Sequence, residues 1–537
     1  MPRSRSAVVT AVAAMSMLAG ALPAPAWSVP VAGSTSSPGR SAPQPPVPDL
    51  PETTLPDLTS VSPLDEGRAV PPPRPIESQP EQGDARLGAA AVALAPLTFS
   101  FKADAYGIHN LSRDRFPYAR ATPTALVDSG VHDAAGVRMR RIGNRLYDHP
   151  VGQAGYGIDN VESFVLNGDQ RYLNRAKAQA GRLIARADKI GTAWYLPYPF
   201  DFYLHGRANA RMAAPWYSAM AQGQAMTLFV RLYELTNDVR YRNAADGVFA
   251  SFLRPRGAGT PWVVWVDKYK RLWLEEYPGT SPDRTLNGHL FATYGMWDYW
   301  RLTQDERAKT LYRGALTTAA DYFTAYRNPK WLSQYCLTHP TALSYVYHLI
   351  HLRQFFRIFA ISRGLAFLRL AETLSADYPP PAVKGLVIFA AGTHTGVKFT
   401  SAGKVAARKT LRLTRPSFAP ADRRERVRGQ PGLWYRITAG ALAGHYVQEK
   451  YAISAMRGRS LSYRHYPARR VTMAANKQFT GFTFDNLGKV LSRVSVVTTE
   501  VTPFGTIAAA VWNGREYLLA ETGPLAGRWI QRGTLIV

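Results

Sequence analysis

The chain has 537 residues, which exceeds the size of one ordinary domain and predicts two to four structural units. Lys and Arg total 65 against 38 Asp and Glu, so the formal net charge is +27. Hydrophobic residues make up 46% of the chain and aromatic residues 12%, which excludes a fully disordered or collagen-like protein. The single cysteine excludes a disulfide framework within the chain. A protein this basic is expected to bind a polyanion: nucleic acid, an anionic membrane or an acidic polysaccharide.

Residues 1–26 have the pattern of a secretory signal peptide. Arg3 and Arg5 precede an apolar, Ala-rich stretch, and Ala24 and Ala26 have the spacing of a cleavage site. A membrane anchor is the alternative, but the stretch is short and rich in small residues. We therefore expect a secreted, extracellular protein, associated with the cell wall, without stable membrane insertion and without a nucleic acid partner. Acidic glycans then become the leading polyanion.

Residues 27–94 are rich in Pro and Ser and predict a disordered linker. Residues 95–380 form the next predicted domain, which begins with short strands and continues as amphipathic helices. The expected helices cover residues 161–187, 218–235, 239–253, 286–302, 307–326 and 341–374. Many such helices with short loops favour a mainly α domain in which helices pair around an (α/α) toroid, although an ordinary bundle would give a similar pattern.

Past three consecutive prolines the pattern changes to short strands, and an internal repeat is visible. Thr-Gly-Val-Lys-Phe at 395–399 matches Thr-Gly-Phe-Thr-Phe at 480–484, and Leu-Ala-Gly recurs at 442–444 and 525–527. We predict two small all-β modules, at 381–455 and 456–537. They hold about 24 Lys and Arg against about 7 Asp and Glu, so binding to an anionic cell-wall polymer is expected. Their strand-and-glycine pattern resembles SH3-like or GW-like wall-binding repeats.

Three blocks of the helical domain contain unusual residues. They are Pro-Trp-Tyr-Ser-Ala-Met-Ala-Gln-Gly-Gln at 215–224, Trp-Leu-Glu-Glu-Tyr-Pro at 273–278 followed by Leu-Asn-Gly at 286–288, and Tyr-Cys-Leu-Thr-His at 335–339 followed by Tyr-His-Leu-Ile-His at 347–351. Glu275 and Glu276 are expected to point in opposite directions on an extended segment, so at most one faces a given cleft. His348 and His351 nearly share a helix face, but no third ligand has matching spacing, so no metal site is predicted.

In combination, these blocks resemble the D-glucuronyl C5-epimerase family, which acts on uronic acids in heparosan-like polysaccharides. The resemblance is strongest over residues 215–354. It implies that Glu276, Tyr277, Tyr335 and Tyr347 are the catalytic residues. After Tyr335 the family carries an acidic residue and then an arginine, where this sequence has Cys336 and Thr338.

Epimerisation at C5 of a uronate removes a proton beside a carboxylate and returns one from the opposite face. Two acid/base groups and a source of positive charge are therefore needed. Our hypothesis places Glu276 or Tyr277 on one face and Tyr347 on the other, with Tyr335 supporting them. Direct proton exchange needs no redox cofactor, and we expect no cofactor. The expected substrate-binding residues are Gln222, Asn287, Arg207, Arg211, His348 and His351.

Three other functions fit parts of the sequence. A polysaccharide lyase would remove the same proton and then expel the C4 substituent. A glycoside hydrolase needs two carboxylates, for which Glu276 with Asp283 or Asp298 would serve. A catalytically silent wall-binding protein is the third alternative, supported by the repeats.

Overall fold

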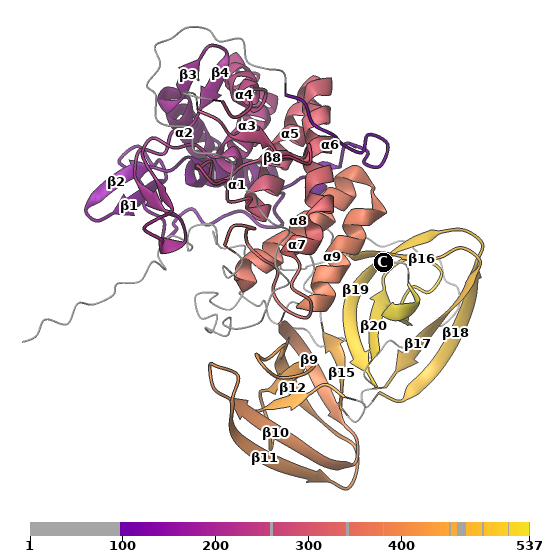
Figure 1. Ribbon diagram of the computed structural model, residues 1–537. Coiled ribbons are helices and arrows are strands. Elements are labelled where there is room, and N and C mark those ends of the chain that lie inside the picture. The colour runs from indigo at the N-terminus through magenta and orange to yellow at the C-terminus, as the bar shows by residue number, and fades with distance from the viewer. Residues whose placement is uncertain are drawn as a thin grey trace, which may run out of the picture. The chain divides into compact units, whose positions relative to one another are not determined.

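The computed structural model describes residues 97–535, apart from 258–260, 340–342, 380, 451–452, 459–468, 486–487 and 514. The predicted signal peptide and the whole predicted linker lie outside these residues. Two units divide the described chain (Figure 1). The first contains the residues up to Arg327 together with Ser333–Ala366, and the second contains Asn328–Leu332 and the chain from Phe367 onward.

Helices dominate the first unit. They are α1 (Pro150–Asn167), α2 (Gln170–Arg186), α3 (Ala219–Thr236), α4 (Val239–Phe252), α5 (Leu286–Thr303), α6 (Glu306–Asp321), α7 (Phe323–Tyr326) and α8 (Tyr345–Ser362). They pack as consecutive pairs, α1 with α2, α3 with α4 and α5 with α6, while α1, α3, α5 and α8 contact one another in that order. An inner row with an outer helix behind each member is the arrangement that an (α/α) toroid requires. Closure of the row into a full ring stays a prediction.

The inner helices α3 and α5 cross with their backbones in contact. A Cβ atom on Gly223 would lie 2.5 Å from Cα of Ala292, and one on Gly295 would lie 2.4 Å from the carbonyl oxygen of Gly223. The glycine of the Ala-Gln-Gly-Gln string is therefore required by helix packing. Residues 219–232 of α3 are all buried, so this helix lies at the centre of the unit.

One kind of turn joins the inner helices α1, α3 and α5 to their outer partners. The inner helix ends at a residue with positive φ, and the next residue is an aspartate whose carboxylate accepts a hydrogen bond from the backbone N–H two positions later. The pairs are Gly168–Asp169, Asn237–Asp238 and Gln304–Asp305. This threefold repeat escaped the sequence analysis because only two or three residues recur.

A residue with positive φ at the end of a helix explains two corrections. The predicted helix over 161–187 is two helices, broken at Gly168 and Asp169. The predicted helix over 341–374 is likewise broken at Arg363, whose φ of 54° ends α8, and α9 (Leu365–Asp377) follows. Apolar periodicity continues across both breaks because each pair of helices buries its apolar faces, so periodicity alone did not reveal them.

Short hairpins carry the loops at the helix ends. They pair β1 (Met139–Ile142) with β2 (Arg145–Asp148), β3 (Asp188–Ile190) with β4 (Ala193–Tyr195), β5 (Phe202–Tyr203) with β6 (Arg211–Met212), and β7 (Val264–Val266) with β8 (Leu272–Leu274). The segment after β8 and the loop before α8 carry most of the residues predicted to be catalytic.

The second unit contains most of α9 and an antiparallel β region. Its first set of strands is β9 (Ala382–Phe389), β10 (Gly392–Phe399), β11 (Val405–Leu413), β12 (Ser417–Glu425), β13 (Trp434–Ile437) and β14 (Tyr446–Gln448). Its second set is β16 (Arg469–Met473), β17 (Lys477–Phe484), β18 (Val490–Thr498), β19 (Thr502–Trp512), β20 (Arg515–Ala520) and β21 (Trp529–Gln531). Between them, β15 (Ile453–Gly458) pairs with β9 and β19. A mainly helical unit followed by all-β structure agrees with the predicted fold class.

The two sets of strands pair in the same order. The first runs β11-β10-β14-β13-β12-β9, and the second runs β18-β17-β21-β20-β19-β16. The glycines of the repeated Thr-Gly blocks occupy matching places: a Cβ on Gly396 would contact Leu442 and His445, and one on Gly481 would contact Leu525 and Arg528. The sequence repeat therefore coincides with a structural one. Its likeness to SH3-like or GW-like repeats stays a prediction, as do the exact module boundaries.

Among the described residues, no helix combines the length and apolar character needed to span a membrane.

Candidate active site

The four residues predicted to be catalytic lie together in the first unit. Glu276 and Tyr277 follow β8, Tyr335 lies in the loop before α8, and Tyr347 lies in the first turn of α8. The hydroxyl oxygens of Tyr277 and Tyr335 are 3.3 Å apart, and the rings of Tyr335 and Tyr347 meet at 4.3 Å between centroids. Tertiary structure thus joins segments that are up to 71 residues apart in sequence.

The two adjacent glutamates face different surroundings. The carboxylate of Glu275 accepts hydrogen bonds from the backbone N–H of Arg284 at 3.1 Å and 3.2 Å, and from Nε1 of Trp265 at 3.3 Å. Glu276 instead lies beside the tyrosine hydroxyls of Tyr277 and Tyr335, which act on its pKa. Glu275 therefore supports the loop, and Glu276 is the carboxyl group that belongs to the site.

Glu276 is a buried carboxyl group with a free oxygen. A Cβ on Gly288 would lie 2.2 Å from its Oε2, so the glycine leaves the space that this oxygen occupies. Within the described chain, Oε2 is buried and has no hydrogen-bond partner. Burial raises the pKa of Glu276 to about 8, against the opposing effect of the Tyr277 hydroxyl. A carboxyl group with such a pKa can accept a proton near neutral pH and release it again.

The three tyrosines are held as neutral phenols. Burial raises the pKa of Tyr277, Tyr335 and Tyr347, and the charge of Glu276 adds to the effect at each. Side-chain exposure is 3% for Tyr335 and 6% for Tyr347, whereas Tyr277 is only partly buried and lies on the more open side of the group. These phenols are therefore protonated at neutral pH and can donate protons.

An aromatic wall holds Tyr277. Its ring stacks on Phe202 at 5.8 Å and lies 6.1 Å from Trp216, which in turn stacks on Tyr198 at 3.8 Å. Half-buried Arg140, on β1, lies 5.7 Å from the Phe202 ring centroid, and its charge acts on Tyr277 and Tyr198. Sequence analysis missed Arg140 because nothing in its local pattern connects β1 with the Glu-Tyr block.

The residues predicted to bind substrate are distributed differently. Gln222 forms hydrogen bonds within the protein. Its side-chain amide accepts one from the backbone N–H of Leu196 and donates to the Trp194 carbonyl and to the Ser251 hydroxyl. Asn287 is fully buried and its Oδ1 has no partner within the described chain, one position from the glycine that faces Glu276. Gln222 therefore holds the scaffold together, and its role in substrate binding stays a prediction.

The predicted cations and histidines need correction. Exposed Arg211 forms an ion pair with Asp201 at 2.5 Å, and Arg207 is exposed on the same loop. His348 and His351 are fully buried, and Nδ1 of each lies within hydrogen-bond distance of the Ser333 hydroxyl, at 3.0 Å and 2.9 Å. Both histidines brace the loop before α8, and neither arginine enters the tyrosine group.

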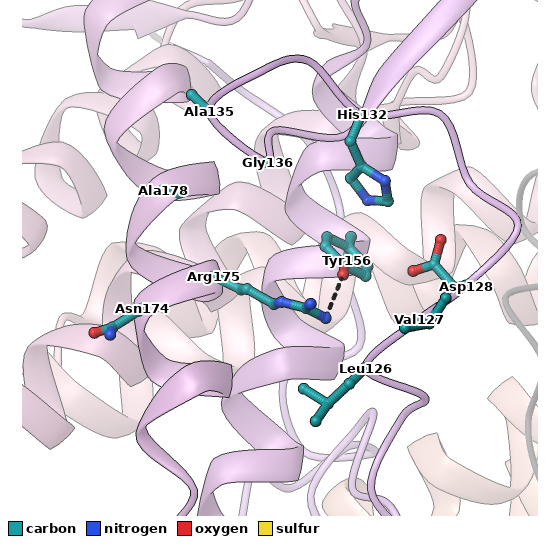
Figure 2. Close-up of a pocket in the computed structure, with 10 residues that line it drawn as sticks. All are labelled: Leu126, Val127, Asp128, His132, Ala135, Gly136, Tyr156, Asn174, Arg175 and Ala178. Atoms are coloured by element: carbon teal, nitrogen blue, oxygen red, sulfur yellow. Dashed lines mark hydrogen bonds between the residues drawn. The ribbon is translucent and has the colours of Figure 1, made fainter.

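A separate pocket of about 410 Å³ lies between residues 126–136 and helices α1 and α2 (Figure 2). Arg175 donates a hydrogen bond to the hydroxyl of Tyr156 at 3.2 Å, drawn as a dashed line, and His132 lies above the Tyr156 ring. Its lining residues include none of those predicted to be catalytic or to bind substrate.

Buried ion pairs within the helical core hold Asp298, one of the carboxylates considered for hydrolysis. Arg231 joins Glu162 of α1 at 2.7 Å to Asp298 of α5 at 3.0 Å, and all three side chains are at most 3% exposed. Arg301 also contacts Asp298, at 3.3 Å. Asp298 is therefore a structural partner of arginines and is not available as a second catalytic carboxylate.

A buried carboxyl group beside clustered phenols can exchange protons with a bound ligand. The family model described as "D-glucuronyl C5-epimerase C-terminus" matches residues 195–373, which contain all four residues predicted to be catalytic. Residues 195–373 are therefore similar to the C-terminal region of the D-glucuronyl C5-epimerase family, which agrees with the resemblance noted in the sequence.

Curated relatives match the same kind of region. The chain is 29% identical over 148 residues to a D-glucuronyl C5-epimerase of Caenorhabditis elegans, which covers 27% of this chain and 23% of that protein. It is 28% identical over 171 residues to an uncharacterized protein of Methanocaldococcus jannaschii, covering 30% of this chain and 54% of that one. The chain thus spans about half or less of the length of these relatives.

Solved structures with some likeness include cellobiose 2-epimerase from Bacillus thermoamylovorans, with 12% identity, a TM-score of 0.34, and coverage of 46% of this chain and 65% of that one. A GH76 α-mannanase from Bacteroides thetaiotaomicron has 12% identity, a TM-score of 0.32, and coverage of 46% and 62%.

Proposed function

We propose that this protein is a uronyl C5-epimerase that converts D-glucuronate residues of an acidic polysaccharide to L-iduronate, or to a related C5 epimer. The observation that carries the proposal is the convergence of Glu276 with Tyr277, Tyr335 and Tyr347 from separate segments, inside the region that matches the epimerase family. A two-base epimerisation requires a base and an acid fixed on opposite faces of one sugar ring, and this group supplies both.

Glu276 is the base in this scheme. Its free Oε2 takes the proton from C5, and the electron pair of the broken C–H bond moves into the substrate carboxylate. With a pKa of about 8, the carboxyl group is ionised in part of the molecules at neutral pH and holds the captured proton well. Half-buried Arg140 interacts electrostatically with Tyr277, and we assign it to the charge that develops on the substrate carboxylate.

Tyr347 is the acid. Its neutral phenol donates a proton to C5 from the other face, which forms the new C–H bond and leaves a phenolate. Tyr335 interacts with the hydroxyls of both Tyr347 and Tyr277, and Tyr277 and Tyr335 both interact with Glu276. The proton held by Glu276 can therefore pass through these hydroxyls to Tyr347 and restore both groups for the next turnover. This gives Tyr335 a relay role.

The test is proton NMR of a glucuronate polymer incubated with the protein in deuterated water. We expect the C5 proton signal to decline as iduronate signals appear, without chain cleavage. Tyr347→Phe should remove this exchange while the protein stays folded by circular dichroism. An ultraviolet-absorbing unsaturated product would establish a lyase, new reducing ends would establish a hydrolase, and normal turnover in Tyr347→Phe would refute the assigned acid.

We also propose that the protein is exported and that its β modules hold an anionic polymer. Arg408, Lys409 and Arg412 are exposed along β11, whereas Arg424 in the Arg-rich segment is neutralised by Glu449 at 2.7 Å. Replacing the three β11 cations with serine should lower the salt concentration that elutes the protein from an immobilised polyglucuronate. Arg171→Ser, which removes one exposed charge from the helical unit, is the control, and an unchanged elution of the triple variant would refute the proposal.

A further inference from the structure

A second group of chemically reactive side chains lies next to Tyr335. It consists of His205, Asp283, Cys336 and His339, and one donor atom from each lies within 4.8 Å of all the others. Asp283 and Cys336 are almost fully buried, while the side chains of His205 and His339 are 9% and 12% exposed. The group is built from three segments: a 3-10 turn after β5, the loop before α5 and the loop before α8.

Three donor distances in this group are close to those of tetrahedral coordination. Ligand bonds of about 2.0–2.3 Å at tetrahedral angles place donor atoms roughly 3.3–3.8 Å apart. Nε2 of His205 is 3.5 Å from both Asp283 Oδ2 and Cys336 Sγ, and Cys336 Sγ is 3.9 Å from His339 Nδ1. A fourth contact, 2.7 Å between His339 Nδ1 and Asp283 Oδ1, is a hydrogen bond that a cation would replace by binding Oδ2.

The chemical types of these ligands indicate which cation the group would bind. A thiolate with two imidazoles and one carboxylate suits a borderline-soft divalent ion such as Zn²⁺, whereas Ca²⁺ and Mg²⁺ prefer oxygen donors. Binding releases the Cys336 thiol proton, and one thiolate with one carboxylate then balances the double charge of the ion. Four protein ligands leave no open coordination position, which is the pattern of a structural site.

We propose that His205, Asp283, Cys336 and His339 form a structural zinc site that fixes the loop carrying Tyr335. Cys336 is the next residue after Tyr335, and the His205 ring meets the Tyr335 ring edge-on at 5.6 Å. The ion therefore ties the Tyr335 loop to the loop of Asp283 and to the His205 turn. Its positioning of Tyr335 for catalysis rests on the proposed function, but metal binding itself does not.

The experiment measures metal binding by the full chain without a histidine tag. Zinc competition with a chromophoric chelator should give one equivalent per chain in the wild type, and Cys336→Ala and His339→Ala should each weaken binding by at least about 100-fold. Co²⁺ loading should give tetrahedral visible bands and a thiolate-to-cobalt ultraviolet band, and Cys336→Ala should lose the latter. His445→Ala, at a partly buried histidine of the second unit, is the control and should bind as the wild type does.

Zinc should also raise the Tm of the wild type and of His445→Ala, but not of Cys336→Ala. Folded wild-type protein that takes up no zinc, or Co²⁺ spectra without a thiolate band, would overturn the proposal. Metal binding without epimerase activity would leave the zinc site standing and refute only the proposed function.

Discussion

Replacing Glu276 with glutamine tests both the catalytic role of this carboxyl group and the effect of burying its charge on the stability of the fold. The amide has the same shape but neither ionises nor accepts a proton at neutral pH. Loss of a positioned general base typically lowers turnover by about 10²- to 10⁴-fold, and we expect a loss in this range for Glu276→Gln in the NMR assay. In the wild type, kcat/KM should rise with pH until Glu276 is ionised, near pH 8.

The same substitution should change how stability depends on pH. Burial raises the pKa of Glu276 from its ordinary value of 4.5 to about 8, so the folded state holds a proton that the unfolded chain has released. The stability linked to this proton is complete below pH 4.5 and is lost as pH rises through 8. At about 1.36 kcal/mol for each pKa unit, the upper limit of this loss is about 5 kcal/mol. Glu276→Gln avoids this loss. The Tm of the variant minus the Tm of the wild type should therefore increase by at least about 2 °C from pH 6 to pH 9.

Glu275→Gln is the matched control because Glu275 is equally buried and adjacent, yet it faces the Arg284 N–H and Trp265. It should keep most of its turnover in the folded protein. The assay pairs C5 exchange by NMR with differential scanning calorimetry across the pH range. Full turnover in Glu276→Gln, or a Tm difference that does not change with pH, would refute the assignment of Glu276 as a buried base.

Three further predictions follow from particular contacts. Gly288→Ala should abolish C5 exchange because its methyl group would displace the Glu276 carboxylate. The control is Gly181→Ala on α2, which has open space around it; it should keep activity and raise the free energy of unfolding in chemical denaturation by about 0.5–1 kcal/mol. Exchange at the wild-type rate in Gly288→Ala would contradict the described packing. Arg140→Gln should lower kcat more than it raises KM if the cation acts on charge developing during proton removal, and a change in KM alone would assign it to substrate binding. Asp298→Asn should lower the free energy of unfolding by about 3–5 kcal/mol, because it leaves the buried Arg231 charge without one of its partners. Urea titration measures this free energy, and a much smaller decrease would contradict the importance of the ion-pair network.

The amino-acid sequence by itself determined the features of this protein that depend on near neighbours. Apolar periodicity located most helices of the first unit, and alternation on an extended segment predicted that Glu275 and Glu276 face different surroundings. The repeated Thr-Gly and Leu-Ala-Gly blocks marked strands that pair in the same order in both halves of the β region. Each of these signals lies within a few residues or repeats literally, so it is visible without a fold.

Only the tertiary structure decided which side chains meet. Arg140 reaches the aromatic wall of Tyr277 from a hairpin more than 130 residues before it, and no local pattern marks such an approach. Cys336 gave no chemical signal in the sequence because its partners at positions 205 and 283 belong to other loops. Gln222 lies in a distinctive sequence block, yet its side-chain amide forms hydrogen bonds inside the core. Burial and convergence are properties of packed segments, and they decide whether a polar side chain supports the fold or serves the site.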